Sequence, residues 1–219
     1  ETTEQQEKEE YIKIIHINNE LLLKLINDIL DMSRIESGTV KLDNTEVHLP
    51  DVLHDLRTII QGNISAKQLD LYIDTQDVHH EDIVTDKLRL NQVLLNIVGN
   101  AVKFTPAGGT INIRVEEKPS ARNGYATFVF SVKDNGIGMS KDFQAHVFDS
   151  FSREQTATRS GIQGAGLGMA ISKNIVDMMG GTIEVQTAPG KGSEFIVRVP
   201  LRIQAEHRKA EKIPALEGL

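Results

Sequence analysis

Residues 91–105, NQVLLNIVGNAVKFT, are the stretch from which the rest of the chain is best understood. As a helix, this stretch places Asn96, Asn100 and Lys103 on one stripe, at i, i+4 and i+7. A neighbouring apolar stripe suits burial against a sheet and comprises Leu90, Leu94, Ile97, Ala101 and Phe104. Amide oxygens suit Mg²⁺, and a lysine supplies a point charge for a phosphate group. Ordinary solvated side chains would explain the polar stripe equally well, so the remaining sequence has to decide between the two interpretations.

The composition of the 219-residue chain is that of an ordinary globular protein, with 25% charged and 39% hydrophobic residues. Its net charge of −7 argues against a nucleic-acid partner held by electrostatics. The lack of cysteine excludes disulfides and thiolate metal sites. No apolar run approaches the roughly 18 residues of a membrane span, and no signal peptide opens the sequence. We therefore expect a cytoplasmic protein, or the cytoplasmic part of a membrane-anchored receptor.

A bundle-type helix is predicted near the N-terminus, over residues 11–36. Its seam residues recur at alternating steps of four and three and comprise Tyr11, Ile15, Asn18, Leu22, Leu25, Ile29 and Met32. One helix cannot bury this stripe alone, so we expect a homodimer through residues 11–36. The polar residues 1–10 are expected to form a loop or a frayed helix start, and Gly38 to end the helix. Residues 1–38 are thus the first predicted unit.

The second predicted unit, residues 39–201, alternates strands with helices. Strands are predicted at residues 46–50, 69–74, 82–85, 110–116, 125–132, 182–187 and 194–200, and helices at 51–65, 91–105, 143–151 and 167–179. Consecutive hairpins favour a mixed sheet with helices on one face. The predicted fold class is α+β, a two-layer α/β sandwich preceded by a long bundle or coiled-coil helix. Residues 202–219 are expected to be a polar tail or linker.

Asp134 ends one of these strands and is followed by Asn135-Gly136-Ile137-Gly138. Glycines allow the backbone to approach a flat ligand closely. A carboxylate at a strand end can accept hydrogen bonds from an exocyclic amine such as that of adenine. A plain Asp-Asn-Gly turn explains the same residues, so this segment alone leaves both interpretations open.

A second glycine-rich stretch, GAGLGMAI, holds Gly164, Gly166 and Gly168 just ahead of a predicted helix. Glycines at this position leave room for phosphates, which the free amides and the dipole of a helix N-terminus favour. The polar loop over residues 152–163 is expected to fold over a ligand as a lid. A flexible turn without a ligand is the alternative for the glycines.

Three side chains beside this loop are ambiguous. Phe148 and Phe151 have a spacing that is more typical of core packing than of ligand contacts. Arg153 is either a phosphate ligand or a solvated loop arginine.

Five stretches, NIVGNAVKFT, DNGIGM, FDSFSRE, GAGLGMAI and GKGSEF, resemble in order and separation the ATP-binding boxes of sensor histidine kinases. Those kinases share a superfamily with gyrase-type topoisomerases, a heat-shock chaperone class and a mismatch-repair ATPase. The preceding stretch LLLKLINDILDMSRIESG resembles the second helix of the kinase dimerisation hairpin. The resemblance covers roughly residues 8–201 and implies a two-layer sandwich with ATP bound between helices and lid.

The resemblance also implies roles for the matching residues. Asn100 would be the main Mg²⁺ ligand, with Asn96 beside it, and Lys103 would contact phosphate. Asp134 would read the adenine amino group, and Ser193, which replaces a more usual threonine, would serve the adenine through water. The catalytic candidates are Asn96, Lys103 and Arg153. The residues expected to bind ATP comprise Asn96, Asn100, Lys103, Phe104, Asp134, Gly136, Ile137, Gly138, Met139, Phe148, Gly164, Gly166, Leu167, Gly168 and Ser193.

Asn96 separates two kinds of activity within the superfamily, because the hydrolysing relatives carry glutamate there. A neutral amide cannot take a proton from water and is a poor general base, which favours phosphoryl transfer to an external acceptor. The resemblance implies a protein-histidine kinase that transfers the γ-phosphoryl group of ATP to a histidine, for relay to an aspartate of a response-regulator receiver domain. Catalysis would consist mostly of positioning and Mg²⁺ charge neutralisation. The acceptor helix would precede Glu1, so we expect this chain alone not to phosphorylate itself.

Two other functions stay open at this point. One is an ATP-driven conformational clamp of the gyrase or chaperone type, against which Asn96 argues. The other is a non-catalytic nucleotide-binding or dimerisation module, against which the intact boxes argue. His16 lies beside the seam of the first helix and is not expected to be the acceptor. Four further histidines lack metal-ligand spacing and are expected at the surface, namely His48, His54, His79 and His80.

Overall fold

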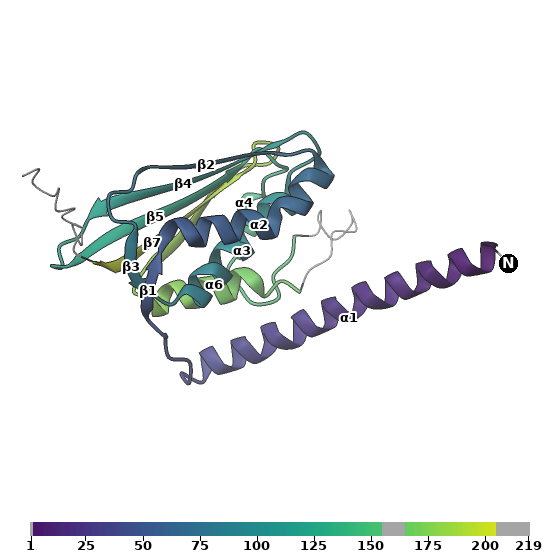
Figure 1. The fold of residues 1–219 in the computed structure, drawn as a ribbon, viewed down its shortest axis with the longest axis horizontal. Helices are drawn as coiled ribbons and strands as arrows, with labels where there is room; N and C mark the ends of the chain where they lie inside the picture. Colours follow the sequence, from purple (N-terminus) through teal and green to yellow (C-terminus); the bar gives the residue numbers. More distant parts are fainter. Residues whose placement is uncertain (1, 155–164, 205–219) are drawn as a thin grey trace, which may run out of the picture.

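A computed structural model describes residues 2–154 and 165–204, which form a curved sheet, a layer of helices and one long helix that extends away from both (Figure 1). The helices are α1 (Thr2–Glu36), α2 (Leu49–Lys67), α3 (Lys87–Phe104), α4 (Lys141–Gln144) and α6 (Gly168–Met178). The strands are β1 (Thr45–His48), β2 (Asp70–Asp77), β3 (Asp82–Thr85), β4 (Thr110–Pro119), β5 (Tyr125–Asp134), β6 (Thr182–Thr187) and β7 (Ser193–Ile203). The elements from β1 to β7 are called the α/β unit below. The predicted α+β class, with helices on one face of a mixed sheet, is confirmed.

Within the described residues, seven strands form one sheet in the order β1-β3-β7-β5-β4-β2, and β6 pairs with β7. β2 runs parallel to β4, whereas every other pairing is antiparallel. β4 and β5 form the predicted hairpin, in which Ile113 lies opposite Val132. Alternate side chains of β5 point inward, and Phe128 and Phe130 are fully buried there. This period of two places Asp134 at the inner face, at the end of the strand.

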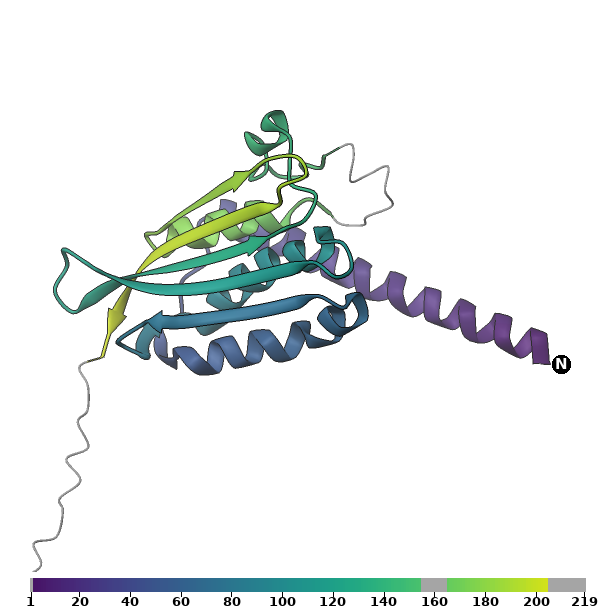
Figure 2. The same cartoon turned by 90° about the horizontal axis from the view of Figure 1, so that it is seen from above.

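Helices α2, α3 and α6 cover one face of this sheet (Figure 2). α3 begins after Asp86, whose side chain accepts a hydrogen bond of 3.0 Å from the Arg89 amide. The predicted apolar stripe of α3 is buried from Leu90 to Ala101, but Phe104 is only half-buried. Burial of this stripe fixes the rotation of α3, so its polar stripe faces away from the sheet.

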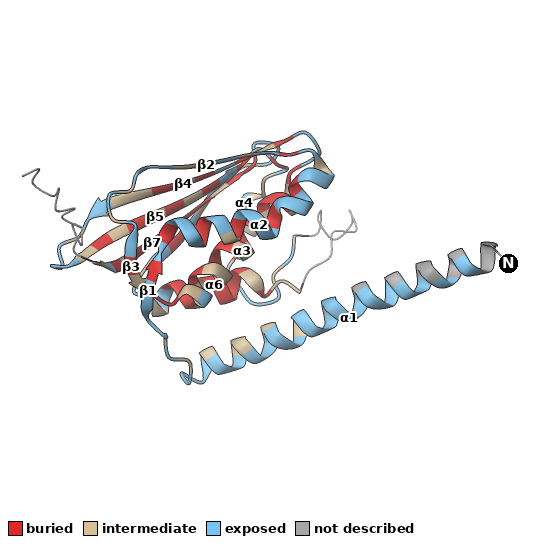
Figure 3. Ribbon diagram, in the orientation of Figure 1, coloured by how far each residue is buried: buried red, intermediate tan, exposed pale blue. Residues whose placement is uncertain are grey.

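α1 runs as a single helix from Thr2 to Glu36, so of the two alternatives expected over residues 1–10 the helix start, and not the loop, is found for residues 2–10. Glutamate, glutamine and lysine dominate this opening, and all three favour helix. Gly38 ends the helix with a φ of 66°, as predicted. Most of α1 is exposed (Figure 3). Its exposed large apolar side chains include Tyr11, Ile12, Ile14, Ile15, Leu22, Leu23, Ile26, Ile29 and Leu30.

The segment after β5 differs most from the prediction. A helix was expected over residues 143–151, but α4 spans only Lys141–Gln144, and turns follow it. Phe151 has a φ of 62°, in the left-handed region, which cannot continue a right-handed helix. Elsewhere the predicted elements agree to within a few residues, and β3 has the predicted bounds. None of the described helices combines the length and the apolarity needed to cross a bilayer.

Candidate functional site

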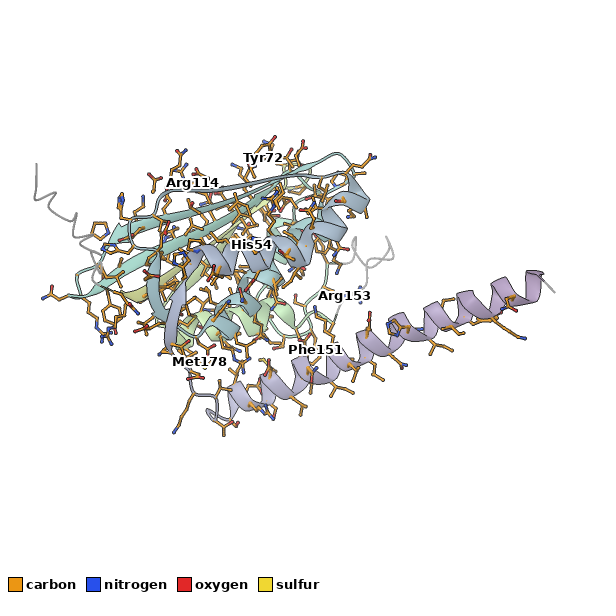
Figure 4. All side chains as sticks on the ribbon, in the orientation of Figure 1. His54, Tyr72, Arg114, Phe151, Arg153 and Met178 are labelled. Carbon is orange, nitrogen blue, oxygen red and sulfur yellow. The ribbon has the colours of Figure 1, made fainter. Side chains whose placement is uncertain are left out.

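A cavity of about 590 Å³ opens at the end of the helical layer, between α3, the loop after β5, the start of α6 and α1. Most of the predicted ATP-binding residues line it. These are Asn96, Asn100, Lys103, Phe104, Asp134, Ile137, Gly138, Met139, Gly166, Gly168 and Ser193, together with the catalytic candidate Arg153. Arg153 and Phe151 lie on the side of the α/β unit toward α1 in the view of Figure 4. The tertiary structure thus brings together residues that are far apart in the sequence.

Three predicted site residues within the described part of the chain are not among the cavity lining. Gly136 packs beneath the end of α3, where a side chain would meet the main-chain oxygen of Phe104 at 2.6 Å. Phe148 packs edge-on against Phe195, with ring centroids 6.5 Å apart, which is the core contact that its spacing favoured. Leu167, the residue immediately before α6, is fully buried. Gly164, and residues 155–163 of the expected lid, lie outside the described residues.

Asn96 and Asn100 present amides to the cavity from successive turns of α3. The Asn96 Nδ2 group donates to the Gly168 oxygen at 3.0 Å and to Ser172 Oγ at 3.1 Å, so it joins α3 to α6. These bonds use the donor end of the amide and leave Oδ1 as the atom able to accept from water or to coordinate a cation. Two amide oxygens fit Mg²⁺, which keeps several waters and usually shares phosphate oxygens with its nucleotide.

Lys103 supplies positive charge one turn further along α3. Its Nζ lies 4.9 Å from the ring centroid of Phe104. Burial lowers the pKa of Lys103, and the positive charges of Arg153 and Lys24 lower it further. Because neighbouring positive charges disfavour the protonated form of Lys103, an anionic ligand bound beside them would be favoured.

Asp134 is a buried carboxylate in the cavity lining. Its Oδ1 accepts a hydrogen bond of 2.8 Å from the Gly136 amide. Burial raises the pKa of Asp134, while the backbone amides of Gly136 and Ser193 act in the opposite direction. The residue therefore acts mainly as a hydrogen-bond acceptor next to a close-packed glycine turn, and its second oxygen suits an amine of a planar ligand.

A hydroxyl network that the sequence analysis missed orients Ser193. Thr187 Oγ1 accepts from the Met139 amide at 2.9 Å, donates to the Gly192 oxygen at 3.0 Å and contacts Ser193 Oγ at 2.9 Å. Because the Thr187 proton goes to Gly192, Ser193 donates to Thr187 and presents acceptor lone pairs to the cavity. The signal for Thr187 was the expected hairpin of the last two strands, which places Thr187 opposite Ser193.

Glycines make the close approaches around Asp134 possible. Gly138 has a φ of 65°, and a Cβ there would collide with the Ala188 oxygen. Gly166 has a φ of 74° and lies against the backbone of Ser152 and Phe151, which closes the cavity beside Arg153. Side chains at these two positions would separate the loops that enclose the cavity.

Several lining residues carried no signal in the sequence. α1 contributes Lys24 and Asp28, which carried no signal, and Leu25, which was predicted as a seam residue of the first helix and lines the cavity against the core of the α/β unit. Apolar lining from the α/β unit also went unpredicted and comprises Leu95, Phe143, Val147, Met169 and Phe195. Periodicity indicates that such residues are apolar, but not that they border a cavity.

None of the histidines in the part of the chain that the structure describes lines the cavity. Of the four expected at the surface, His48 has its Nδ1 atom 2.9 Å from Asp82 and His80 has its Nδ1 atom 2.6 Å from Glu117. Among residues 2–154 and 165–204, no group of three or more His, Cys, Asp or Glu side chains is arranged to hold a metal ion.

Residues 85–203 match the model of the family described as histidine kinase-, DNA gyrase B- and HSP90-like ATPase. The chain belongs to this ATPase family. The autoinducer 2 sensor kinase/phosphatase LuxQ of Vibrio parahaemolyticus is 34% identical over 203 residues, which cover 92% of this chain and 23% of LuxQ. The sensor protein GacS of Pseudomonas syringae is 37% identical over 214 residues, which cover 96% of this chain and 23% of GacS.

Solved structures of the ATPase family give the same assignment. Full-length ShkA in complex with AMPPNP superposes with a TM-score of 0.75 at 30% identity, over 91% of this chain and 40% of that chain. The predicted resemblance to the catalytic ATP-binding domain of sensor histidine kinases is therefore confirmed. The chain spans about a quarter of the length of the curated relatives it matches.

Proposed function

We propose that this chain is the ATP-binding catalytic part of a sensor histidine kinase, which transfers the γ-phosphoryl group of ATP to a histidine. The phosphoryl group then passes to an aspartate of a response-regulator receiver domain. The observation that carries this proposal is the cavity, whose lining combines two amides and two cations with a buried carboxylate. The kinase relatives, and the AMPPNP complex of ShkA, support ATP as its ligand because AMPPNP is an ATP analogue.

Different lining residues take different parts of the nucleotide in this proposal. Asp134 accepts from the adenine amino group, and the lone pairs of Ser193 accept from the same group or from a bridging water. Lys103 and Arg153 contact the phosphates. Asn100 and the Oδ1 atom of Asn96 would hold Mg²⁺, which would neutralise phosphate charge.

The environment of Asn96 supports transfer over hydrolysis. Its side chain is neutral, and its nitrogen is already bonded to Gly168 and Ser172. It therefore holds the two helices in place and offers no base to deprotonate a water molecule. Steady ATP hydrolysis by the chain, abolished by Asn96→Ala, would instead favour the clamp-type alternative.

α1 is the second helix of a dimerisation hairpin in this proposal, and its exposed apolar residues between 11 and 36 form the homodimer contact. In this proposal residues 1–38 supply the dimer contact, residues 39–201 are the ATP-binding catalytic domain, and residues 202–219 are a polar tail or linker. His16 is exposed, and its Nε2 atom lies 3.1 Å from the Glu20 carboxylate one turn away on the same helix. In this proposal α1 is not the acceptor helix, so the acceptor histidine lies outside residues 1–219.

The proposal is tested by calorimetric titration of the chain with ATP and inorganic tripolyphosphate, both with Mg²⁺. We expect ATP to bind, and Asp134→Ala to weaken ATP far more than tripolyphosphate. Equal losses for both ligands would show that Asp134 is only a turn residue. No binding of ATP to the folded wild-type chain would reject the proposed function.

A label-transfer experiment tests the second part of the proposal. The chain is incubated with γ-labelled ATP, and we expect no label on the protein. Label on His16, lost in His16→Ala, would overturn the placement of the acceptor outside this chain.

A further inference from the structure

One wall of the cavity comes from α1, outside the α/β unit. Lys24, Leu25 and Asp28 all line it. Lys24 and Asp28 are one helical turn apart, so both lie on the face of α1 that is turned toward the cavity. Leu25 packs against the hydrophobic core of the α/β unit and fixes this orientation. A ligand that fills the cavity would therefore touch two separate units of the chain.

A polar clamp holds α1 in this position. Asp31 accepts hydrogen bonds from Arg89 Nη1 at 3.0 Å and from Gln92 Nε2 at 2.9 Å, and Arg89 also donates to Gln92 at 2.7 Å. The side chains of Asp31 and Arg89 are only 21% and 15% exposed. Arg89 holds the pKa of Asp31 below its usual range despite partial burial of the carboxyl. The docked position of α1 is thus set by a part-buried, hydrogen-bonded ion pair. Hydrogen bonds between charged groups are stronger than those between neutral groups.

Apolar and amide contacts continue the docking surface toward the end of α1. Met32 and Ile35 pack against the core of the α/β unit. Asn174 of α6 lies with its Nδ2 atom 3.6 Å from the sulfur of Met32. The contacts therefore extend over three turns of α1, from Leu25 to Ile35, and they secure the turn that carries Lys24.

Three cations line the cavity, namely Lys24, Lys103 and Arg153. Lys24 is close enough to Lys103 for its charge to affect the lysine on α3. Asp28 is the acidic residue of α1 in the lining, and its partial burial opposes its ionisation. The positive charges of Lys24 and Arg153 oppose protonation of Lys103, and Asp28 offsets part of the charge of Lys24. A triphosphate bound beside these cations would stabilise their charged forms.

We propose that Lys24 is a phosphate-binding residue supplied by α1, so that the nucleotide bridges α1 and the α/β unit and stabilises the docked helix. This inference rests on the proposed function, because it takes the ligand to be a nucleoside triphosphate. A ligand that contacts α1 only in the docked position shifts the equilibrium toward that position. The coupling is reciprocal, so docking of α1 raises the affinity for the nucleotide by the same factor.

Titration of charge variants with MgATP and with adenosine tests the bridge. Lys24→Gln should weaken MgATP about five- to tenfold, the lower range of site-to-site coupling, and leave adenosine unaffected. Lys41→Gln is the matched control, because it removes the same charge from an exposed residue outside the cavity lining. Equal MgATP affinities for Lys24→Gln, Lys41→Gln and wild type would overturn the inference while leaving the proposed function intact. Failure of the wild type to bind ATP would instead reject the proposed function.

A double-mutant cycle then tests whether Lys24 acts through docking. Asp31→Ala removes the clamp and should itself weaken MgATP, with circular dichroism checking that the variant is folded. In the Asp31→Ala background, Lys24→Gln should have little further effect, because the undocked helix no longer holds Lys24 at the cavity. Full additivity of the two substitutions would overturn the inference. In the wild type, MgATP should slow amide hydrogen exchange over residues 24–35, and unchanged exchange there would count against the bridge.

Discussion

The side-chain amide of Asn96 donates a hydrogen bond of 3.0 Å to the main-chain oxygen of Gly168, and so ties the middle of α3 to the first residue of α6. A second bond, of 3.1 Å, reaches Ser172 Oγ one turn later. Both helices contribute residues to the cavity. The contact that holds the cavity walls together is thus made by a residue that is also a candidate metal ligand.

This double role predicts different outcomes for the two cavity asparagines. Asn96→Ala should lower the free energy of unfolding by about 1–2 kcal/mol, because two part-buried hydrogen bonds are lost. Asn100→Ala should leave unfolding almost unchanged but weaken MgATP. Urea denaturation and calorimetric titration of both variants provide the comparison. Equal stability losses would contradict the division of roles.

The lowered pKa of Lys103 predicts that the affinity for ATP decreases at alkaline pH. Burial and the neighbouring cations make Lys103 lose its proton below the usual pH range of lysine. Only the protonated form attracts phosphate, so ATP affinity should fall as the pH rises through this lowered pKa. Lys103→Arg keeps its charge and should flatten the alkaline limb of the affinity profile. Lys103→Gln should bind weakly at every pH, and an alkaline limb that persists in this variant would assign the dependence to another group.

Lys67, a residue of α2, is predicted to stabilise the C-terminal end of α3 by direct hydrogen bonds. Its ammonium donates to the oxygens of Val102, Lys103 and Thr105 at 2.8, 2.9 and 3.1 Å. A cation at a helix C-terminus interacts favourably with the dipole and satisfies free carbonyls. Lys67→Gln should therefore cost about 2 kcal/mol of stability and weaken ATP, since Lys103 lies on the capped turn.

Lys118→Gln is the control for the Lys67 substitution, because it removes the same charge from an exposed residue of β4. Denaturation and ATP titration should show little change for this variant. If Lys67→Gln behaves like Lys118→Gln, the three carbonyl contacts do not stabilise the site.

Gly190 and Gly192 lie in the same turn and allow the cost of backbone strain to be distinguished from the cost of a steric collision. Gly190 and Gly192 have φ values of 72° and 77°, so alanine at either position costs about 1–2 kcal/mol. A Cβ at Gly190 would meet nothing within 4 Å, whereas a Cβ at Gly192 would collide with the main-chain oxygen of Asp134. Gly192→Ala should therefore lose clearly more stability and ATP affinity than Gly190→Ala. Equal thermal denaturation midpoints for the two variants would show that the turn moves freely away from Asp134.

The sequence by itself determined the elements whose signals are local. The repeat of apolar residues in α3 predicted both the helix and the polar stripe with Asn96, Asn100 and Lys103, because burial of one face fixes the other. Alternation predicted the β4–β5 hairpin and thereby placed Asp134 at a strand end. Local preference left a loop and a helix start both open over residues 2–10, which are part of α1, and it was misread where the left-handed Phe151 ends the helical segment early.

Only the tertiary structure decided which of these elements meet. The parallel pairing of β2 with β4, the reach of Lys67 to α3, the Thr187 network and the clamp of Asp31 on Arg89 all join segments that periodicity treats separately. Such contacts depend on how helices and strands pack around a shared core, and a residue's own neighbours in the chain do not specify this. For that reason α1 could be predicted as a helix from its sequence, but its role as a wall of the cavity could not.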